Sequence, residues 1–293
     1  MKIDFEITET FNGKKVLQIL QNEMNLSGRL IKKLKVSGGI LLNGKPVRTV
    51  DHVNKGDILS VIIDFREEAD IEPENSDFSI LYEDDCILAV NKEPGMPVHP
   101  SAGHPTGTLA NRVLAHFIKQ GLSIKVRPIN RLDKDTSGIV LFAKNPHIQE
   151  QIINQMKENR VYKSYLGIVH GMFDPPDGII NLPIARKSGS IMERIIDPEG
   201  APSITVYKTM EIHKDLSLVE FILKTGRTHQ IRVHCRAMGH PLLGDWLYSD
   251  IQTDLIGRQA LHSHIFAFDH PLNGQRIELS APLPEDMEKA LTV

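Results

Sequence analysis

The chain has 293 residues, of which 41% are hydrophobic and 24% are charged, enough for one large core and a small additional domain. No apolar run approaches the roughly 20 residues of a membrane-spanning helix, and the N-terminal MKIDFEITET lacks the apolar stretch of a secretory signal. The two cysteines, Cys86 and Cys235, lie far apart, which favours a reduced protein in the cytoplasm. A monomer is the default expectation, and no membrane is expected as a partner.

The charges are unevenly distributed along the chain. The formal net charge of −3 argues against a protein that is basic throughout, as many nucleic-acid binders are. Residues 24–50, however, contain no acidic residue and six basic ones, which are Arg29, Lys32, Lys33, Lys35, Lys45 and Arg48. The acidic stretch 66–77 (REEADIEPENSD) follows. This order favours a basic patch and an acidic linker, although a solvated helix face beside a loop explains the charges equally well.

The first 65 residues predict a compact unit. Apolar residues at helical spacing favour two helices, the second capped by Ser27 and ended by Gly38–Gly39. The Asn43–Gly44 pair favours a tight turn between two short strands, 40–42 and 46–50.

The stretch LSGRLIKKLKVSGGILLNGKPV, together with KGDILSV, resembles the small RNA-binding domain named after ribosomal small-subunit protein four. The resemblance covers about residues 12–65. In that family a pair of helices and a tight turn present basic residues to folded RNA, which implies that Arg29, Lys32 and Lys33 contact RNA phosphates. We therefore expect a small helix-rich RNA-binding domain over residues 1–65.

The remainder of the chain divides into a linker and one large domain. Residues 66–77 are acidic, contain Pro73 and can bury little apolar surface, so we expect a flexible linker. Residues 78–293 are expected to form a single domain. Its first part combines two short strands with a Pro- and Gly-rich loop and a helix over 108–117.

The stretch PINRLDKDTSGIVLFAK places two carboxylates, Asp133 and Asp135, on a loop directly before the apolar strand 139–143. Gly138 permits a sharp turn into that strand. Catalytic groups are often held on loops that a rigid element positions. This loop is therefore the first candidate for a catalytic site.

The downstream pattern predicts elements that support this loop. Asn145–Pro146 predicts the start of a helix, because proline suits the first helical position. The segment KSYLGIV alternates as a strand, with Tyr165, Gly167 and Val169 on one face. The HQIRVH segment favours a helix, which would place Arg232 on a fixed element.

Five ordered sequence blocks resemble the RluA-type family of pseudouridine synthases. The R-L-D-x-x-T-S-G mark of that family runs from Arg131 to Gly138. The other blocks are NKEPGMPVHPSAG, KSYLGIVHG, TGRTHQIRVH, and RQALH with APLP. The resemblance spans about residues 78–285. It implies an α+β fold with a large, mostly antiparallel mixed sheet and flanking helices. It also implies isomerisation of uridines in structured RNA, with large-subunit ribosomal RNA favoured and no cofactor or metal.

The same resemblance implies roles for individual residues. Asp133 is the catalytic carboxylate, acting as a nucleophile toward the sugar or assisting a glycal intermediate, and Arg232 is the cation paired with it. Arg131 fills the gap left in the RNA when the uridine flips out. Tyr165 offers a ring on which the uracil stacks and a candidate base for the final proton removal. Ile231 lies under the pyrimidine.

One position departs from the family pattern. Asn130 stands where many members have a histidine before the arginine of the R-L-D loop. An asparagine can still shape the loop by hydrogen bonding, so we expect activity to be retained. The departure prevents the substrate of any particular member from being transferred to this chain.

Two other functions stay open at this point. A non-catalytic RNA-binding assembly factor would keep the fold, but it would not need the Asp133 carboxylate. A glycosidase for small nucleosides would leave the basic N-terminal patch unexplained. A metal site is not expected, because the candidate ligands match no common zinc spacing; they are His229, His234, Cys235 and His240.

Overall fold

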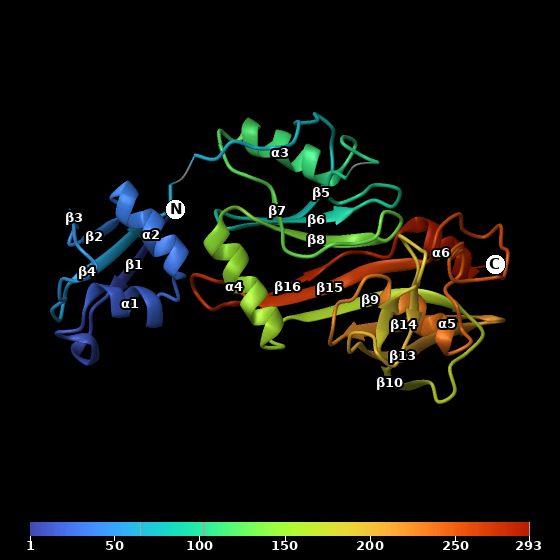
Figure 1. Cartoon of the computed structure of the whole chain (residues 1–293). Coiled ribbons are helices and arrows are strands. Elements are labelled where there is room, and N and C mark those ends of the chain that lie inside the picture. The colour runs from blue at the N-terminus through green and yellow to red at the C-terminus, as the bar shows by residue number, and fades with distance from the viewer. Residues whose placement is uncertain (65, 102, 293) are drawn as a thin grey trace.

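The computed structural model describes residues 1–64, 66–101 and 103–292. A smaller N-terminal unit lies beside a larger unit that contains the C-terminus (Figure 1). Among the residues described, no helix combines the length and the apolar character needed to cross a membrane.

The N-terminal unit combines a four-stranded sheet with two helices. The strands lie in the order β1–β4–β2–β3. Their bounds are Lys2–Glu6 for β1, Ile40–Leu42 for β2, Lys45–Pro46 for β3 and Ile58–Ile62 for β4. The helices are η1 (Glu9–Phe11, a short 3-10 helix), α1 (Val16–Asn22) and α2 (Gly28–Ser37). Apolar side chains of α1, α2 and the sheet close one core, with Leu20, Leu34 and Leu59 fully buried.

Local signals in the sequence explain the second helix and the hairpin of this unit. Ser27 accepts a hydrogen bond from the amide of Leu30, and Gly38 ends α2 in the left-handed region at a φ of 70°. Asn43 and Gly44 also have positive φ values, 51° and 78°, as the tight turn between β2 and β3 requires. The strand predicted at 46–50 is wrong in extent, since β3 ends at Pro46.

The helix-rich N-terminal domain predicted from the sequence also contains a strand that was not predicted. Strand β1 was not predicted, and it pairs with β4 from Lys2–Ile62 to Glu6–Ile58. Its segment KIDFE alternates between exposed and half-buried positions. The unit is therefore a mixed helix-and-sheet structure.

The acidic segment 66–77, predicted as a flexible linker, makes several hydrogen bonds with the larger unit. Glu67 receives two 2.7 Å hydrogen bonds from the Arg127 guanidinium. The backbone carbonyl of Glu72 accepts a 2.7 Å hydrogen bond from the Asn111 side chain, and Glu74 accepts one of 2.9 Å from the amide of Gly107. The segment thus follows the surface of the larger unit near α3 (Figure 1). The domain boundaries themselves remain a prediction.

A ten-stranded sheet forms the centre of the larger unit. Its strands lie in the order β10–β13–β14–β9–β15–β8–β6–β5, with β16 beside β15 and β7 beside β8. Their bounds are β5 Ser79–Glu83, β6 Ile87–Lys92, β7 Arg127–Pro128, β8 Ser137–Ala143, β9 Tyr162–His170, β10 Asp177–Asn181, β13 Ile204–His213, β14 Leu216–Leu223, β15 Leu261–Asp269 and β16 Arg276–Ser280. Strands β8 and β15 pair in parallel, and the other described neighbours in this sheet pair antiparallel. This confirms the predicted mixed, mostly antiparallel sheet.

Four helices flank this sheet, and a small second sheet lies beside one of them. The helices are α3 (Leu109–Lys119), α4 (Pro146–Lys157), α5 (Gln230–Ala237) and α6 (Glu285–Thr292), and the small sheet pairs β11 (Ile184–Arg186) with β12 (Arg194–Ile196). Helix α4 begins as predicted: Asn145 accepts a 3.0 Å hydrogen bond from the amide of Ile148, with Pro146 in the first helical position. Helix α5 confirms the helix predicted at HQIRVH.

The order of the central strands brings the candidate loop and the candidate tyrosine together. Strand β15 lies between β8 and β9, and its Ser263 pairs with Gly138 on one side and with Tyr165 on the other. Gly138 has a φ of 105°, and a Cβ atom there would collide with the backbone of Ser263. A glycine at position 138 is therefore needed for β8 to begin this close to β15. The start of β8 then lies across β15 from Tyr165 on β9.

Candidate active site

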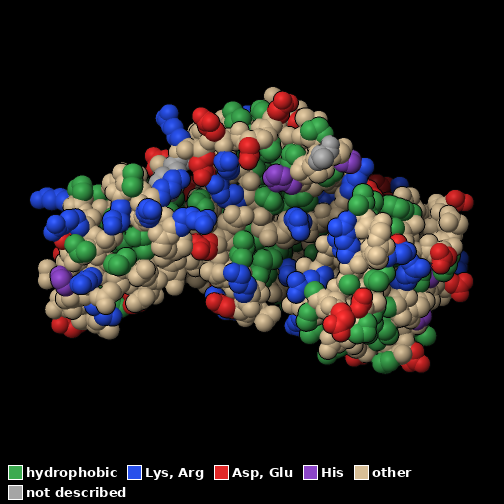
Figure 2. Space-filling view, in the orientation of Figure 1, with side chains coloured by type: hydrophobic (Ala, Val, Ile, Leu, Met, Phe, Trp, Pro, Cys, Tyr) green, Lys and Arg blue, Asp and Glu red, His purple; other side chains and the backbone are tan. Residues whose placement is uncertain are grey.

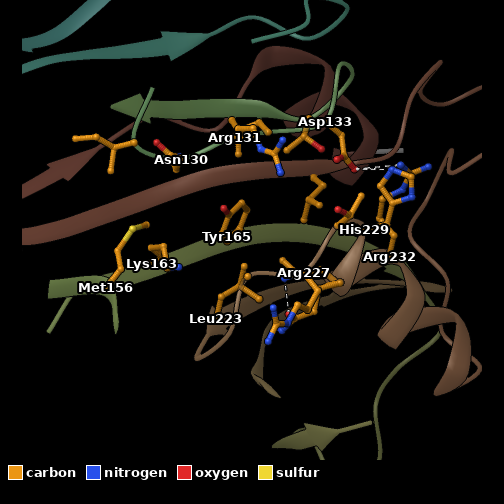
Figure 3. A pocket seen from close by; sticks show the side chains of 18 residues that line it. Asn130, Arg131, Asp133, Met156, Lys163, Tyr165, Leu223, Arg227, His229 and Arg232 are labelled. Carbon is orange, nitrogen blue, oxygen red and sulfur yellow. Dashed lines mark hydrogen bonds and ion pairs between the residues drawn. The ribbon is translucent and has the colours of Figure 1, made fainter. Parts of the chain in front are cut away.

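A cleft of about 480 Å³ lies over β9 and β15. It is lined by the loop that precedes β8, by side chains of β9, and by the segment from Leu223 to Arg232. Four of the residues singled out from the sequence line it together, namely Asp133, Tyr165, Arg232 and Ile231, and Arg131 stands at its edge. Figure 3 shows Asp133 and Arg232 at one end of the cleft, and Lys163 and Met156 at the other.

Asp133 and Arg232 form the ion pair that the family resemblance implied. The Nη1 atom of Arg232 donates a 3.1 Å hydrogen bond to Oδ2 of Asp133. The two residues are 99 positions apart in the chain, and helix α5 carries the arginine. Arg232 is buried, with 4% of its surface exposed, whereas Asp133 is half-buried at the cleft wall. A carboxylate that reaches the cleft therefore has a fixed cation beside it.

Asp245 is a member of this site that the sequence reasoning missed. Its two oxygens accept 2.7 Å hydrogen bonds from Nε and Nη2 of Arg232, and it is fully buried. The ring of Tyr248 lies 5.0 Å from the guanidinium carbon. Burial lowers the pKa of Arg232, but the hydrogen bonds and charges of Asp245 and Asp133 outweigh it and raise that pKa above its ordinary value. Asp245 lies in the GDWLY segment, whose Trp246 is exposed.

Tyr165 projects from β9 into the same cleft and has 7% of its surface exposed. Burial, with a smaller effect of the Asp133 charge, raises the pKa of Tyr165 to about 12. Its hydroxyl is therefore protonated near neutral pH in the unliganded protein. Stacking and hydrogen-bond donation are open to this protonated form, and the role of a base that the family resemblance implied stays a prediction. Ile231, on the first turn of α5, adds an apolar wall and is also buried.

The loop that carries Asp133 is held by hydrogen bonds to buried side chains. Asn130 donates a 2.9 Å hydrogen bond to the carbonyl of Ile139 and accepts one of 2.9 Å from the amide of Leu141. Asn130 is itself buried. This confirms that an asparagine at the departing position shapes the loop. Arg131 is exposed at the cleft edge.

Two buried cations hold the backbone on the other side of Asp133. The Lys92 ammonium donates a 2.8 Å hydrogen bond to the carbonyl of Lys134, and Arg258 donates one of 3.1 Å to the carbonyl of Asp135. Arg258 also forms two hydrogen bonds, of 2.7 and 2.8 Å, with the Asp286 carboxylate of α6. The sequence reasoning missed both cations, although each lies inside a quoted family block.

His229 is a further member of the site, which the sequence considered only as a metal ligand. It has a φ of 58°, which is uncommon for a residue other than glycine. Its Nε2 lies 3.7 Å from Oδ2 of Asp133, and its Nδ1 lies 2.8 Å from the Tyr248 hydroxyl. Burial lowers the pKa of His229, and the nearby Asp133 charge opposes this shift without outweighing it. His234, another candidate metal ligand, is engaged elsewhere, since its two ring nitrogens contact Thr205 and Leu182.

The three basic residues predicted to contact RNA lie outside the cleft. Arg29, Lys32 and Lys33 are exposed on α2 of the N-terminal unit. Lys33 lies 3.9 Å from the carboxylate of Glu67. Lys and Arg side chains are spread over the N-terminal unit and around the hollowed centre of the larger one (Figure 2).

Two family models match the chain. The model described as RNA pseudouridylate synthase matches residues 86–237, which include Asp133, Tyr165 and Arg232. The model described as RluD ribosomal pseudouridine synthase N-terminal domain matches residues 3–59.

Known proteins of similar sequence carry related names. A Bacillus subtilis (strain 168) protein named uncharacterized RNA pseudouridine synthase YlyB is 37% identical over 294 residues, which cover 99% of this chain and 97% of that protein. A Haemophilus ducreyi protein named ribosomal large subunit pseudouridine synthase D is 35% identical over 261 residues, which cover 85% of this chain and 79% of that protein.

Solved structures share the architecture. The structure described as human RNA pseudouridylate synthase domain containing 1 is 28% identical, with a TM-score of 0.59, and covers 72% of this chain and 86% of its own. The human domain containing 4 structure, at 21% identity, has a TM-score of 0.61, covers 73% of this chain and 92% of its own, and shows the same fold. Because one family model matches more than half of the chain and relatives align over nearly all of it, the chain belongs to the RluA-type family of RNA pseudouridine synthases and is an enzyme of that family.

Proposed function

We propose that this protein converts specific uridines of structured large-subunit ribosomal RNA into pseudouridine, with Asp133 as the carboxylate that acts on the ribose. The observation that carries the proposal is the Asp133–Arg232–Asp245 array at the end of a cleft that also contains Tyr165. A protein that only held RNA would have no use for a carboxylate placed against a buried arginine.

The reaction needs a carboxylate near the sugar. The bond between N1 of uracil and C1′ of ribose breaks, the base turns, and C5 bonds to C1′. The proton on C5 leaves and N1 gains one, so the rearrangement needs no oxidant or reductant. Asp133 either adds to C1′ or assists the formation of a glycal, and both routes use an anion beside a carbon that becomes electron-poor. Arg232 keeps this anion oriented through its 3.1 Å hydrogen bond.

The remaining cleft residues suit the flipped nucleotide. A uridine inside folded RNA must leave its stack before it is reached, at a cost of a few kcal/mol. The Tyr165 ring and the Ile231 side chain offer two apolar surfaces for the uracil. Stacking on an aromatic ring is worth roughly 1–3 kcal/mol per base. Arg131 is exposed and lines the cleft, which supports the proposal that it occupies the gap left in the RNA.

The RNA partner is proposed on two grounds. The Haemophilus relative is named for the ribosomal large subunit. The N-terminal unit, over residues 1–65, presents Arg29, Lys32 and Lys33 on an exposed helix face, which suits phosphate contacts with a folded RNA. We propose that this unit docks on the RNA while residues 78–293 modify it, that the protein acts as a monomer, and that it works in the cytoplasm.

The test is tritium release from RNA labelled at uridine C5, because pseudouridine formation expels that hydrogen. Unmodified large-subunit ribosomal RNA and bulk transfer RNA serve as substrates. The wild type is expected to release tritium, and Asp133→Asn, which keeps the size of the side chain, is expected to release none. Asp135→Asn, two residues along the same loop, serves as the matched control and should resemble the wild type. Bound RNA without release by the wild type would favour a non-catalytic assembly factor.

A further inference from the structure

Lys163 is a half-buried cation in the cleft that the reaction described above does not use. It lies on β9 two residues before Tyr165, so the two side chains share a face of the strand. Figure 3 shows it at the end of the cleft away from Asp133. Within the described part of the chain, its ammonium has no hydrogen bond or ion pair, and burial lowers the pKa of Lys163.

The cleft's other buried cation is already neutralised. Arg232 is bound by both Asp133 and Asp245. Lys163, by contrast, is partly removed from water without an anion to offset the cost. A buried charge without a partner is unfavourable, and an anionic ligand removes this penalty on binding. The unpaired Lys163 therefore favours binding of an anionic ligand group at the end of the cleft away from Asp133.

The surface beyond Lys163 continues the cleft. A small adjoining hollow shares Lys163, Met156 and Leu223 with the main cleft. Its outer wall adds Asn159 and Lys224, both exposed. The surface that leads away from Asp133 therefore carries the ammonium groups of Lys163 and Lys224 and the side-chain amide of Asn159. The apolar side chains of Met156 and Leu223 line the same surface.

We infer that Lys163 and Lys224 form a phosphodiester subsite for the RNA strand that flanks the flipped uridine. Two residues of strand span about 7 Å, so Lys163 is set apart from the ring on which the target uracil stacks. It reaches the backbone of a neighbouring nucleotide. Met156 and Leu223 offer apolar contact to that nucleotide's sugar or base. The identification of the ligand as RNA rests on the proposed function. The preference for an anion at the Lys163 end of the cleft rests only on the burial of Lys163 without an anionic partner among the described residues.

The test separates a phosphate contact from a structural role. Lys163→Met removes the charge and keeps an unbranched side chain, whereas Lys163→Arg keeps the charge. The matched control is Lys208→Met, at an exposed position of strand β13. Binding of decauridylate is measured over a series of salt concentrations. Loss of one phosphate contact to a single strand lowers the slope of log K against log salt by about 0.7. Lys163→Met should show this loss, and the other two variants should keep the wild-type slope.

Kinetics on in vitro transcribed large-subunit ribosomal RNA give a second readout. Lys163→Met is expected to raise KM about tenfold, as for a lost hydrogen bond to a charged group, and to leave kcat within about twofold. Lys163→Arg should restore KM. An unchanged salt slope in Lys163→Met, or a loss confined to kcat, would overturn the subsite. A reduced slope in a protein whose wild type releases no tritium would support the subsite and reject the proposed function, so the two failures are distinguishable.

Discussion

Asp245 binds Arg232 through Nε and Nη2, at 2.7 Å each, and leaves Nη1 for the 3.1 Å hydrogen bond to Asp133. The carboxylate behind the arginine thus decides where its remaining donor points. Asp245 also accepts hydrogen bonds from the amides of Leu247 and Tyr248, which fix its own position. The orientation of the candidate catalytic carboxylate therefore depends on a residue that never reaches the cleft.

Replacing Asp245 is expected to reduce both activity and stability. Asp245→Asn removes a buried negative charge and one of the two acceptors, which leaves Arg232 partly unpaired. Breaking one side of a buried ion pair costs about 3–5 kcal/mol. We expect a drop in the free energy of unfolding of that order and at least about a tenfold loss in kcat/KM. Urea denaturation and tritium release measure the two effects. Asp250→Asn, at an exposed position nearby, is the control, and equal behaviour of the two variants would contradict the role given to Asp245.

Replacing Tyr165 is expected to separate stacking from proton transfer. With a pKa of about 12 the hydroxyl is protonated near neutral pH, so the ring should matter most for binding. Tyr165→Phe should keep KM within about threefold, whereas Tyr165→Leu should lose a stacking contribution of about 1–3 kcal/mol. Steady-state tritium release measures both. If Tyr165→Phe loses kcat and the wild-type rate climbs with pH above neutrality, the hydroxyl acts as the base after all.

Removing the Asn130 side chain is expected to destabilise the loop that carries Asp133. Asn130→Ala leaves the carbonyl of Ile139 and the amide of Leu141 without their partners, and both are buried. Each unsatisfied group costs about 1–3 kcal/mol. We expect a loss of about 2–4 kcal/mol in the free energy of unfolding. Asn181→Ala, on the exposed face of β10, should stay within about 0.5 kcal/mol of the wild type. A neutral Asn130→Ala would show that water replaces both contacts.

Because His262 is buried, we expect the free energy of unfolding to fall at acidic pH. Burial lowers the pKa of His262 to about 4, and its Nδ1 lies 2.9 Å from the Ser137 hydroxyl. Between about pH 6.5 and pH 4 the unfolded chain binds a proton at this position that the folded chain does not, so stability falls as the pH falls through this window. His262→Gln should reduce the difference in unfolding free energy between pH 7.5 and pH 5. Urea titrations at both pH values test this.

The control for that titration is His104→Gln, because His104 is exposed in the loop before α3. It should keep the wild-type dependence on pH. Other buried histidines also have lowered pKa values, among them His147 and His234, so the slope should be reduced in His262→Gln without vanishing. An identical slope in His262→Gln and the wild type would reject the assignment.

Features that depend on neighbouring residues could be predicted from the sequence alone. Ser27 caps α2, Asn145 and Pro146 begin α4, and Asn43–Gly44 forms a tight turn, because the hydrogen bonds and φ values concerned lie within a few residues. The R-L-D loop and the HQIRVH helix could likewise be located, since each is a continuous segment. Asp133 and Arg232 were paired by family resemblance, and the pairing is present at 3.1 Å.

Only the tertiary structure decided which distant groups surround Asp133. Asp245, His229, Lys92 and Arg258 lie in four separate segments, and their contacts exist because β15 inserts between β8 and β9 and because α5 packs beside the sheet. Strand β1 is similar: its segment has no fully buried residue, and only its pairing with β4 makes it a strand. The local periodicity of the sequence does not predict which remote strands pair, because the packing of the whole core selects the pairing.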